Sequence, residues 1–179
     1  MRRVEWVIVV VRVPSEPSRH RVAVWRELRR GGAFPLGTGT WVLPATPLTA
    51  ETLDRLRDLI GRTPDGELLL LDAHGRDEMS EERLQKQYTA AREEEWLEFI
   101  NDCAKFLAEL KREVTKRKFT LAELEEEEQS LERLRRWHRE LALRDSFGAP
   151  SAGEGAIALK VSTERLGNYA EQVYRFLGQ

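Results

Sequence analysis

The first 73 residues alternate between short apolar segments and longer amphipathic segments, with proline or glycine between them. The segment Val4–Val13 is rich in β-branched residues and stops at Pro14, which is typical of a buried strand. The amphipathic segments have the apolar spacing of helices. We expect strands over residues 4–13, 33–36, 40–43 and 67–73, and helices over residues 18–30 and 49–60.

This order of strand, helix, strand, strand, helix and strand predicts an α+β fold of the ferredoxin-like βαββαβ type over residues 1–78. Two crossover helices would then cover one face of a four-stranded antiparallel sheet. The opposite face needs cover as well, because an apolar sheet face must be buried against another layer. We expect that cover to come from the rest of the chain or from a second copy.

Two local features of this region concern its helices. Ser18 and Thr49 are expected to be the N-caps of the first and second helix. Val22, Trp25 and Leu28 recur at helical spacing and predict the buried face of the first helix.

Residues 79–179 have the pattern of a helical region. Apolar residues at alternating steps of three and four predict a helical hairpin over about residues 80–145, with a break at Phe119-Thr120. Glycine, proline and serine predict a linker over about residues 146–160, and a last helix follows over about 163–177. The expected core positions of the hairpin are Ile100, Cys103, Leu107, Leu110 and Val114 in its first helix and Leu124, Leu131, Leu134, His138 and Leu141 in its second.

Charge is distributed unevenly along the chain. The formal net charge is −2, which argues against a generally basic nucleic-acid-binding protein. Residues 1–30 nevertheless carry a local net charge of +5, and residues 76–146 carry a local net charge of −4. The basic residues of the first segment are all arginines, namely Arg2, Arg3, Arg12, Arg19, Arg21, Arg26, Arg29 and Arg30.

The usual signatures of catalytic, metal and cofactor sites are weak. Gly37–Gly39 fits a hairpin turn better than a phosphate loop, because it lacks a third glycine and opens no helix. The three histidines are scattered; Asp72 and His74 are more typical of a surface pair than of an acid–base site. His138 is expected to pack in the hairpin. We therefore predict no catalytic residues, no metal and no cofactor.

Cys103 is the single cysteine of the chain, so no internal disulfide can form. Its place on the apolar stripe predicts a buried packing role, since an apolar environment raises the pKa of a thiol. A redox role for Cys103 stays open as the alternative. The longest apolar run is also too short to cross a membrane.

The best candidate for function is the arginine-rich first segment. Arg12, Ser18, Arg19 and Arg21 lie at a strand end and in a first helical turn, where free N–H groups and guanidinium groups suit an oxyanion. Arg26, Arg29 and Arg30 could contact DNA phosphates, although a solvated helix face is an equally good interpretation of them.

Eight short motifs follow one another along most of the chain: Pro17–Arg19, Arg21–Arg26, Gly32–Ala33, Trp41–Pro44, Ala91–Glu93, Phe119–Glu126, Leu134–Trp137 and Arg144–Pro150. Each motif is unspecific, but their order along the chain is more specific. In this order they resemble the N-terminal domain of ChrB-type chromate-resistance proteins, over about residues 5–177.

The resemblance implies a cytoplasmic bacterial protein that acts as a chromate-responsive transcriptional regulator. We do not expect an enzyme, because no set of catalytic residues comes together in the sequence. The implied partners are DNA and chromate or another oxyanion, and we expect a homodimer and no membrane association. Two alternatives remain open. The first is a helical-hairpin adaptor or dimerisation protein that does not bind DNA, and the second is an oxyanion-binding sensor or enzyme.

Overall fold

The computed structural model describes residues 4–178, and Arg2 and Arg3 lie outside this range. The chain divides into two compact units. The sheet unit holds the described residues up to Ala91 together with Leu143–Phe147, and the helical unit holds Arg92–Ala142 with the described residues from Gly148 on. The division falls within a long helix, rather than at the predicted position between residues 78 and 79.

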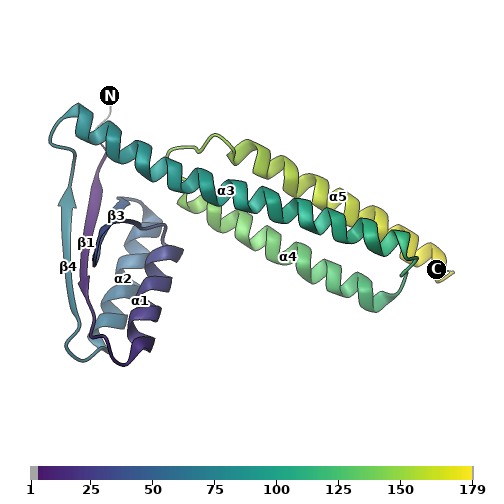
Figure 1. Cartoon of the computed structure of the whole chain (residues 1–179), viewed down its shortest axis with the longest axis horizontal. Helices are drawn as coiled ribbons and strands as arrows, with labels where there is room; N and C mark the ends of the chain where they lie inside the picture. Colours follow the sequence, from purple (N-terminus) through teal and green to yellow (C-terminus); the bar gives the residue numbers. More distant parts are fainter. Residues whose placement is uncertain (1–3, 179) are drawn as a thin grey trace. The chain divides into compact units, whose positions relative to one another are not determined.

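The sheet unit contains a four-stranded antiparallel sheet and two crossover helices (Figure 1). The strands lie in the order β2-β3-β1-β4, and every neighbouring pair is antiparallel. The predicted order of strand, helix, strand, strand, helix and strand is confirmed, and so is the α+β class. The elements are β1 (Trp6–Arg12), α1 (Ser18–Arg30), β2 (Phe34–Gly37), β3 (Thr40–Pro44), α2 (Pro47–Gly61) and β4 (Glu67–Ala73).

Strand β1 is apolar on both sides of the sheet. Side chains alternate between the two faces of a strand, and Val7, Val9 and Val11 pack into one core with α1 and α2. Trp6 belongs to a second core on the other face. A central strand with this composition needs a layer of structure on each side of the sheet.

The beginning of α3 (Glu78–Thr115) supplies the second layer. Tyr88 is buried against Trp6 and Val42, and the ring centroids of Trp6 and Tyr88 are 5.7 Å apart in an edge-on arrangement. The ring centroid of Phe147 lies 5.6 Å from that of Tyr88, and Phe147 completes the aromatic cluster. The chain itself therefore covers part of the second sheet face, while Leu69 of the edge strand β4 stays about half exposed.

A buried carboxylate attaches α3 to the sheet. Glu81 is 4% exposed and accepts hydrogen bonds from the indole N–H of Trp6 and from the backbone N–H of Gly75, both at 2.7 Å. A Cβ atom at position 75 would lie 2.7 Å from the backbone nitrogen of Glu81, so this close approach requires glycine. The first turns of α3 are thereby joined both to β1 and to the segment that follows β4.

Both predicted helix caps are wrong, the first by one residue and the second by three. Pro17 is the N-cap of α1, and no side chain caps that helix, so Ser18 is its first helical residue. Thr46 is the N-cap of α2, and its hydroxyl accepts a hydrogen bond from the backbone N–H of Thr49 at 3.2 Å. Pro47 at the first helical position explains the earlier start, because proline suits that position and needs no hydrogen-bond acceptor there.

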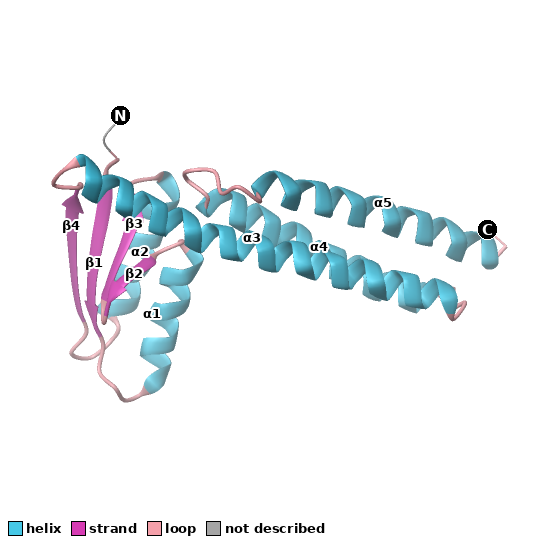
Figure 2. Ribbon diagram, turned by 45° about the horizontal axis from the view of Figure 1, so that its top comes forward, coloured by secondary structure: helices cyan, strands magenta, loops and turns pink. Residues whose placement is uncertain are grey.

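The helical unit consists of α3 from Arg92 on, α4 (Leu121–Arg144) as far as Ala142, and α5 (Ala152–Phe176), and these helices run side by side (Figures 1 and 2). The predicted linker over residues 146–160 is wrong, because α5 already begins at Ala152. Gly155 is helical there and packs on Trp96, where a Cβ atom would lie 2.6 Å from the indole ring. Gly155 therefore serves close packing of the helices rather than chain flexibility.

The core of the helical unit partly follows the predicted stripes. All five predicted positions of α4 pack into this core or against its aromatic rings. In α3 the stripe is shifted by one residue at two positions, since Phe99 and Phe106 are buried instead of Ile100 and Leu107. The larger aromatic side chains occupy the helix–helix interface. Alternating steps of three and four do not by themselves decide which of two adjacent apolar residues is buried there.

None of the helices in the described part of the chain combines the length and apolarity that a bilayer crossing requires.

We predict that Glu81→Ala lowers the free energy of unfolding by about 2–4 kcal/mol, because the buried indole N–H of Trp6 and the partly buried N–H of Gly75 lose their acceptor. Urea unfolding followed by tryptophan fluorescence measures this change. Glu82→Ala is the matched control, since Glu82 is exposed on the same turn, and its effect should stay within about 0.5 kcal/mol. Equal losses in the two variants would contradict a fastening role for Glu81.

We predict that the helical unit becomes less stable as the pH falls below 6.5. Burial beside Trp96 and Phe99 lowers the pKa of His138 from its ordinary value of 6.5, and its Nε2 atom has no hydrogen-bond partner. The unfolded chain therefore binds the proton more tightly, so stability is full above pH 6.5 and is lost as the pH falls toward the lowered pKa. Urea unfolding between pH 8 and pH 5 tests this, with His138→Gln as the control that should lose less stability over that range.

Candidate functional site

Helix α1 presents a solvent-facing surface of arginines, which we call the α1 arginine face. Val24 and Leu28 turn inward to the core, and Glu27 accepts a hydrogen bond from Arg55 of α2 at 2.6 Å. Because successive residues are about 100° apart around a helix, the remaining arc of α1 holds basic and apolar residues and no acid. The face consists of Arg19, Arg21, Val22, Trp25, Arg26, Arg29 and Arg30, all of them exposed.

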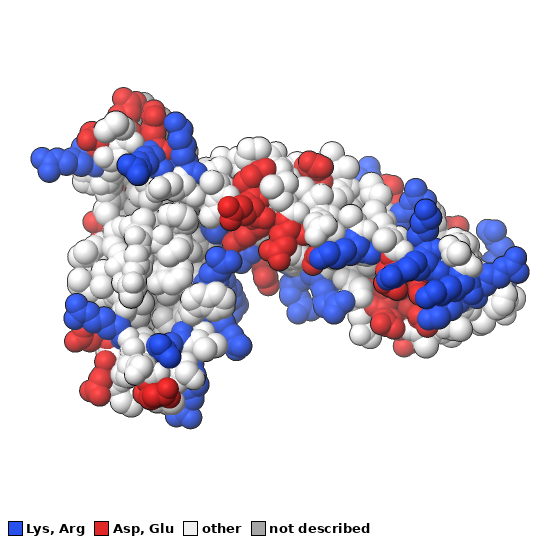
Figure 3. Space-filling view, viewed as in Figure 1, with Lys and Arg blue, Asp and Glu red and all other residues white. Residues whose placement is uncertain are grey.

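Figure 3 shows basic side chains along the edge of the sheet unit that α1 forms. Arg26 and Arg30 are one turn apart on the same side of α1 and are therefore neighbours on this surface. Arg30 approaches Glu27 at 3.8 Å, a long contact between partly exposed groups. Such a contact holds an arginine only weakly, so the guanidinium group of Arg30 can leave Glu27 for another anionic group at little cost.

Trp25 lies in the middle of the face, and its exposure corrects a prediction. The sequence predicts a buried stripe of Val22, Trp25 and Leu28, but Trp25 is 51% exposed and Val22 is exposed too. Leu28 lies at helical spacing from both Val24 and Trp25, so the apolar pattern alone allows two different buried stripes. The guanidinium carbon of Arg29 lies 5.8 Å from the centre of the Trp25 ring, within range of a cation–π contact.

The predicted oxyanion residues are all exposed, but they are not arranged as one cluster. Arg12, at the end of β1, forms an ion pair with Glu67 of β4 at 3.2 Å. Ser18 caps no helix. Arg19 and Arg21 are two residues apart in α1, a spacing at which helical side chains do not face each other. An oxyanion at this helix start stays a prediction, supported only by the absence of a side-chain cap.

Cys103 lies in the core of the helical unit and is 1% exposed. Burial raises the pKa of its thiol above 9.0, and a hydrogen bond with Ser162 opposes this shift. A thiol in such surroundings is a poor nucleophile, because the thiolate is the reactive form. The geometry therefore favours packing over redox chemistry for Cys103.

Asp72 and His74 are both exposed near the end of β4. They line a shallow hollow with Ala45 and Glu5. No group of three or more histidine, cysteine or acidic residues is arranged to hold a metal ion within residues 4–178.

Comparison with known proteins connects this geometry to a family. The family model described as protein ChrB, N-terminal, matches residues 21–179. The chain belongs to the ChrB N-terminal family. The resemblance stated from the sequence is thereby confirmed. The match includes Arg21, Trp25, Arg26, Arg29 and Arg30 of the α1 arginine face.

No curated protein and no solved structure matches the chain.

Sequence reasoning missed Trp25 as a surface residue and two glutamates as core residues. Glu113 and Glu127 are buried in the helical unit, and both continue the three-and-four spacing of their helices. Glu113 follows Phe106 and Leu110 in the stripe of α3, and Glu127 lies between Leu124 and Leu131 in α4. The spacing of Glu113 and Glu127 was the one signal in the sequence that placed them in the core. They were not recognised because many other acidic residues surround them in the hairpin.

We predict that Cys103 in the native protein reacts with an aromatic disulfide reagent on the order of a hundredfold more slowly than in the urea-unfolded protein, because the core must open first. Absorbance of the released thiolate follows the reaction. If the native thiol reacts as quickly as the unfolded one, Cys103 is accessible and its redox role gains support.

Proposed function

We propose that this ChrB-family protein is a non-enzymatic, cytoplasmic regulatory component of chromate resistance that binds DNA through the α1 arginine face. The observation that carries the proposal is the composition of that face, where five arginines surround Trp25 and no acidic side chain interrupts them.

Arginine is well suited to this role because its planar guanidinium group donates several hydrogen bonds to one phosphate. A rigid helix fixes the spacing of the arginines, and phosphate contacts of this kind position a protein on DNA without reading its sequence. The half-exposed indole of Trp25 adds an apolar contact for a sugar or base. In the adaptor alternative, the helical hairpin mediates association with another protein and the chain does not bind DNA, and the experiment below distinguishes the two.

We also propose that the sheet unit is ferredoxin-like. The strand order β2-β3-β1-β4 supports this assignment, together with the core that α1 and α2 share with one sheet face. The homodimer and the oxyanion remain predictions of the sequence. The exposed Leu69 and Leu71 of β4 are compatible with contact to a second copy.

We predict that the protein retards DNA from upstream of its own gene in a mobility-shift assay, and that salt weakens this binding. In Arg26→Gln/Arg30→Gln, the slope of log affinity against log salt concentration should become shallower by about 2, because each phosphate contact contributes about 0.9. Trp25→Ala should weaken binding while it leaves that slope unchanged.

Arg133→Gln/Arg136→Gln is the matched control, since it removes the same charge from exposed positions of α4. Its affinity and slope should equal those of the parent. A parent protein that shifts no DNA at low salt would rule out the DNA-binding proposal and favour the adaptor. An equal change in both double variants would show that only overall charge matters.

A further inference from the structure

The helical unit contains an open groove between α3 and α4, with a volume of about 750 Å³. We call it the α3–α4 groove. Its charged side chains are mainly acidic, and apolar side chains form part of its wall. The lining includes Asp102, Phe106, Glu113, Lys118, Glu127 and Trp137.

Two glutamates occupy positions of this groove that normally hold apolar core residues. Glu113 is 3% exposed and Glu127 is 6% exposed, and they continue the buried stripes of α3 and α4. Burying a carboxylate is costly unless a positive charge or hydrogen bonds compensate for the lost water. Each glutamate therefore needs a partner within the groove.

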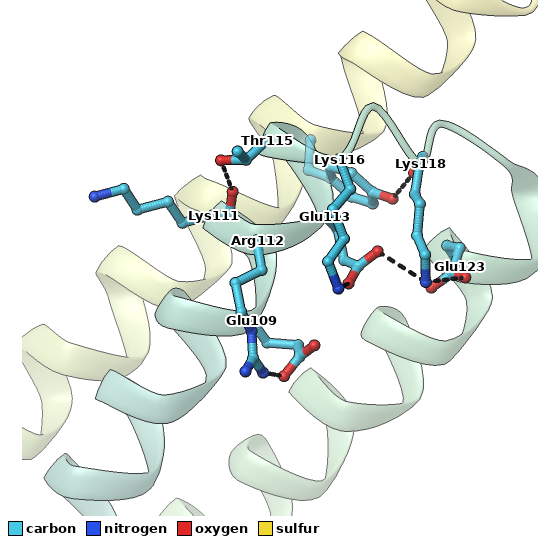
Figure 4. Close-up of polar contacts among 9 residues, drawn as sticks. Glu109, Lys111, Arg112, Glu113, Thr115, Lys116, Lys118 and Glu123 are labelled. Carbon is cyan, nitrogen blue, oxygen red and sulfur yellow. Dashed lines mark hydrogen bonds and ion pairs between the residues drawn. The ribbon is translucent and has the colours of Figure 1, made fainter.

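Lys118 is the partner of Glu113. Its ammonium nitrogen lies 3.3 Å from Glu113 and 3.1 Å from Glu123, between the two carboxylates (Figure 4). Hydrogen bonds to Glu123 and then to Glu113 raise the pKa of Lys118, so it is charged here. The Tyr169 hydroxyl donates a hydrogen bond to the Lys118 carbonyl oxygen at 2.5 Å and holds this segment in place.

Glu127 has no such partner. Among the described residues it makes no hydrogen bond and no ion pair, although it is more than nine-tenths buried and lines the groove. Burial raises its pKa, and the neighbouring carboxylates of Glu126, Glu113 and Glu123 raise it further, while Arg112 opposes them. The site therefore lacks one positive charge.

We propose that the α3–α4 groove binds a linear aliphatic polyamine, with one ammonium group beside Glu127. An ammonium group donates hydrogen bonds to a carboxylate and supplies the missing charge. The methylene chain would lie along Phe106 and Leu134, and Trp137 offers an aromatic ring to a cation. A second ammonium group would reach the Asp102 end of the groove.

The dimensions of the groove fit an elongated ligand. Asp102 and Glu113 are eleven residues apart in α3, which corresponds to about 16 Å along a helix. Asp102 now pairs with Lys105 at 2.6 Å in an exposed contact. An exposed pair of this kind contributes little stability, so a ligand ammonium can replace Lys105 at small cost.

Two other ligand classes fit the groove less well. A divalent metal ion needs several oxygen ligands converging on one point, and no such group of residues occurs in the described part of the chain. An oxyanion such as chromate would meet six carboxylates and only three basic side chains in the lining. The groove is thus different in chemistry from the α1 arginine face, and its test needs no DNA.

Isothermal titration of the full chain with spermidine tests the proposal. We expect saturable binding to the parent and binding weaker by roughly tenfold to a hundredfold in Glu127→Gln, which loses the charged acceptor but keeps the side-chain volume. Glu125→Gln is the matched control, because Glu125 is exposed on α4 and lies outside the groove. It should bind spermidine as the parent does.

Asp102→Asn provides a second test at a partly exposed position that is not needed for the core. It should weaken spermidine binding several-fold and leave the weaker binding of butylamine unchanged, because butylamine has no second ammonium group. Carbon-13 NMR of labelled glutamate side chains should show a spermidine-dependent shift of the Glu127 carboxyl resonance in the parent.

Three results would overturn the proposal. The first is the absence of spermidine binding to the parent at millimolar concentration. The second is equal weakening in Glu127→Gln and Glu125→Gln, which would indicate attraction by overall charge. The third is complete displacement of spermidine by magnesium at matched ionic strength, which would indicate a general cation site.

Discussion

The sheet unit depends on a central strand that is apolar on both faces. Helices α1 and α2 can cover only the face that holds Val7, Val9 and Val11. The other face is covered where α3 begins, and there Glu81 joins α3 to Trp6 through a buried hydrogen bond and to Gly75 through a partly buried one. One acidic side chain therefore fastens the first turns of α3 to the part of the sheet that they cover.

The same packing decides what α1 presents to solvent. Because Val24 and Leu28 face the sheet and Glu27 is held by Arg55, the single acid of the helix is turned away from water. Trp25 and the arginines are left on the outer arc. The proposed DNA-binding surface is thus a consequence of how one helix is rotated on its core, and not only of how many arginines it contains.

In the helical unit, polar residues occupy positions that would be more stable if they were apolar. The ammonium group of Lys118 compensates the buried charge of Glu113. Glu127 has no such partner among the described residues, and burial disfavours its charged form and that of His138. Residues that lower stability in this way are often retained for function. This makes the α3–α4 groove the natural place for a ligand that supplies positive charge.

The sequence by itself determined the strands, the helices and their order, because alternation of apolar residues and the positions of proline and glycine are local properties. It also predicted the core positions of α4 and the membership of the ChrB family. Only the tertiary structure decided that Gly155 lies inside a helix, that Trp25 is exposed, and that Glu113 and Glu127 are buried. Each of these depends on a neighbour distant in the sequence, such as Trp96 for Gly155 and Lys118 for Glu113, and local periodicity cannot specify such contacts.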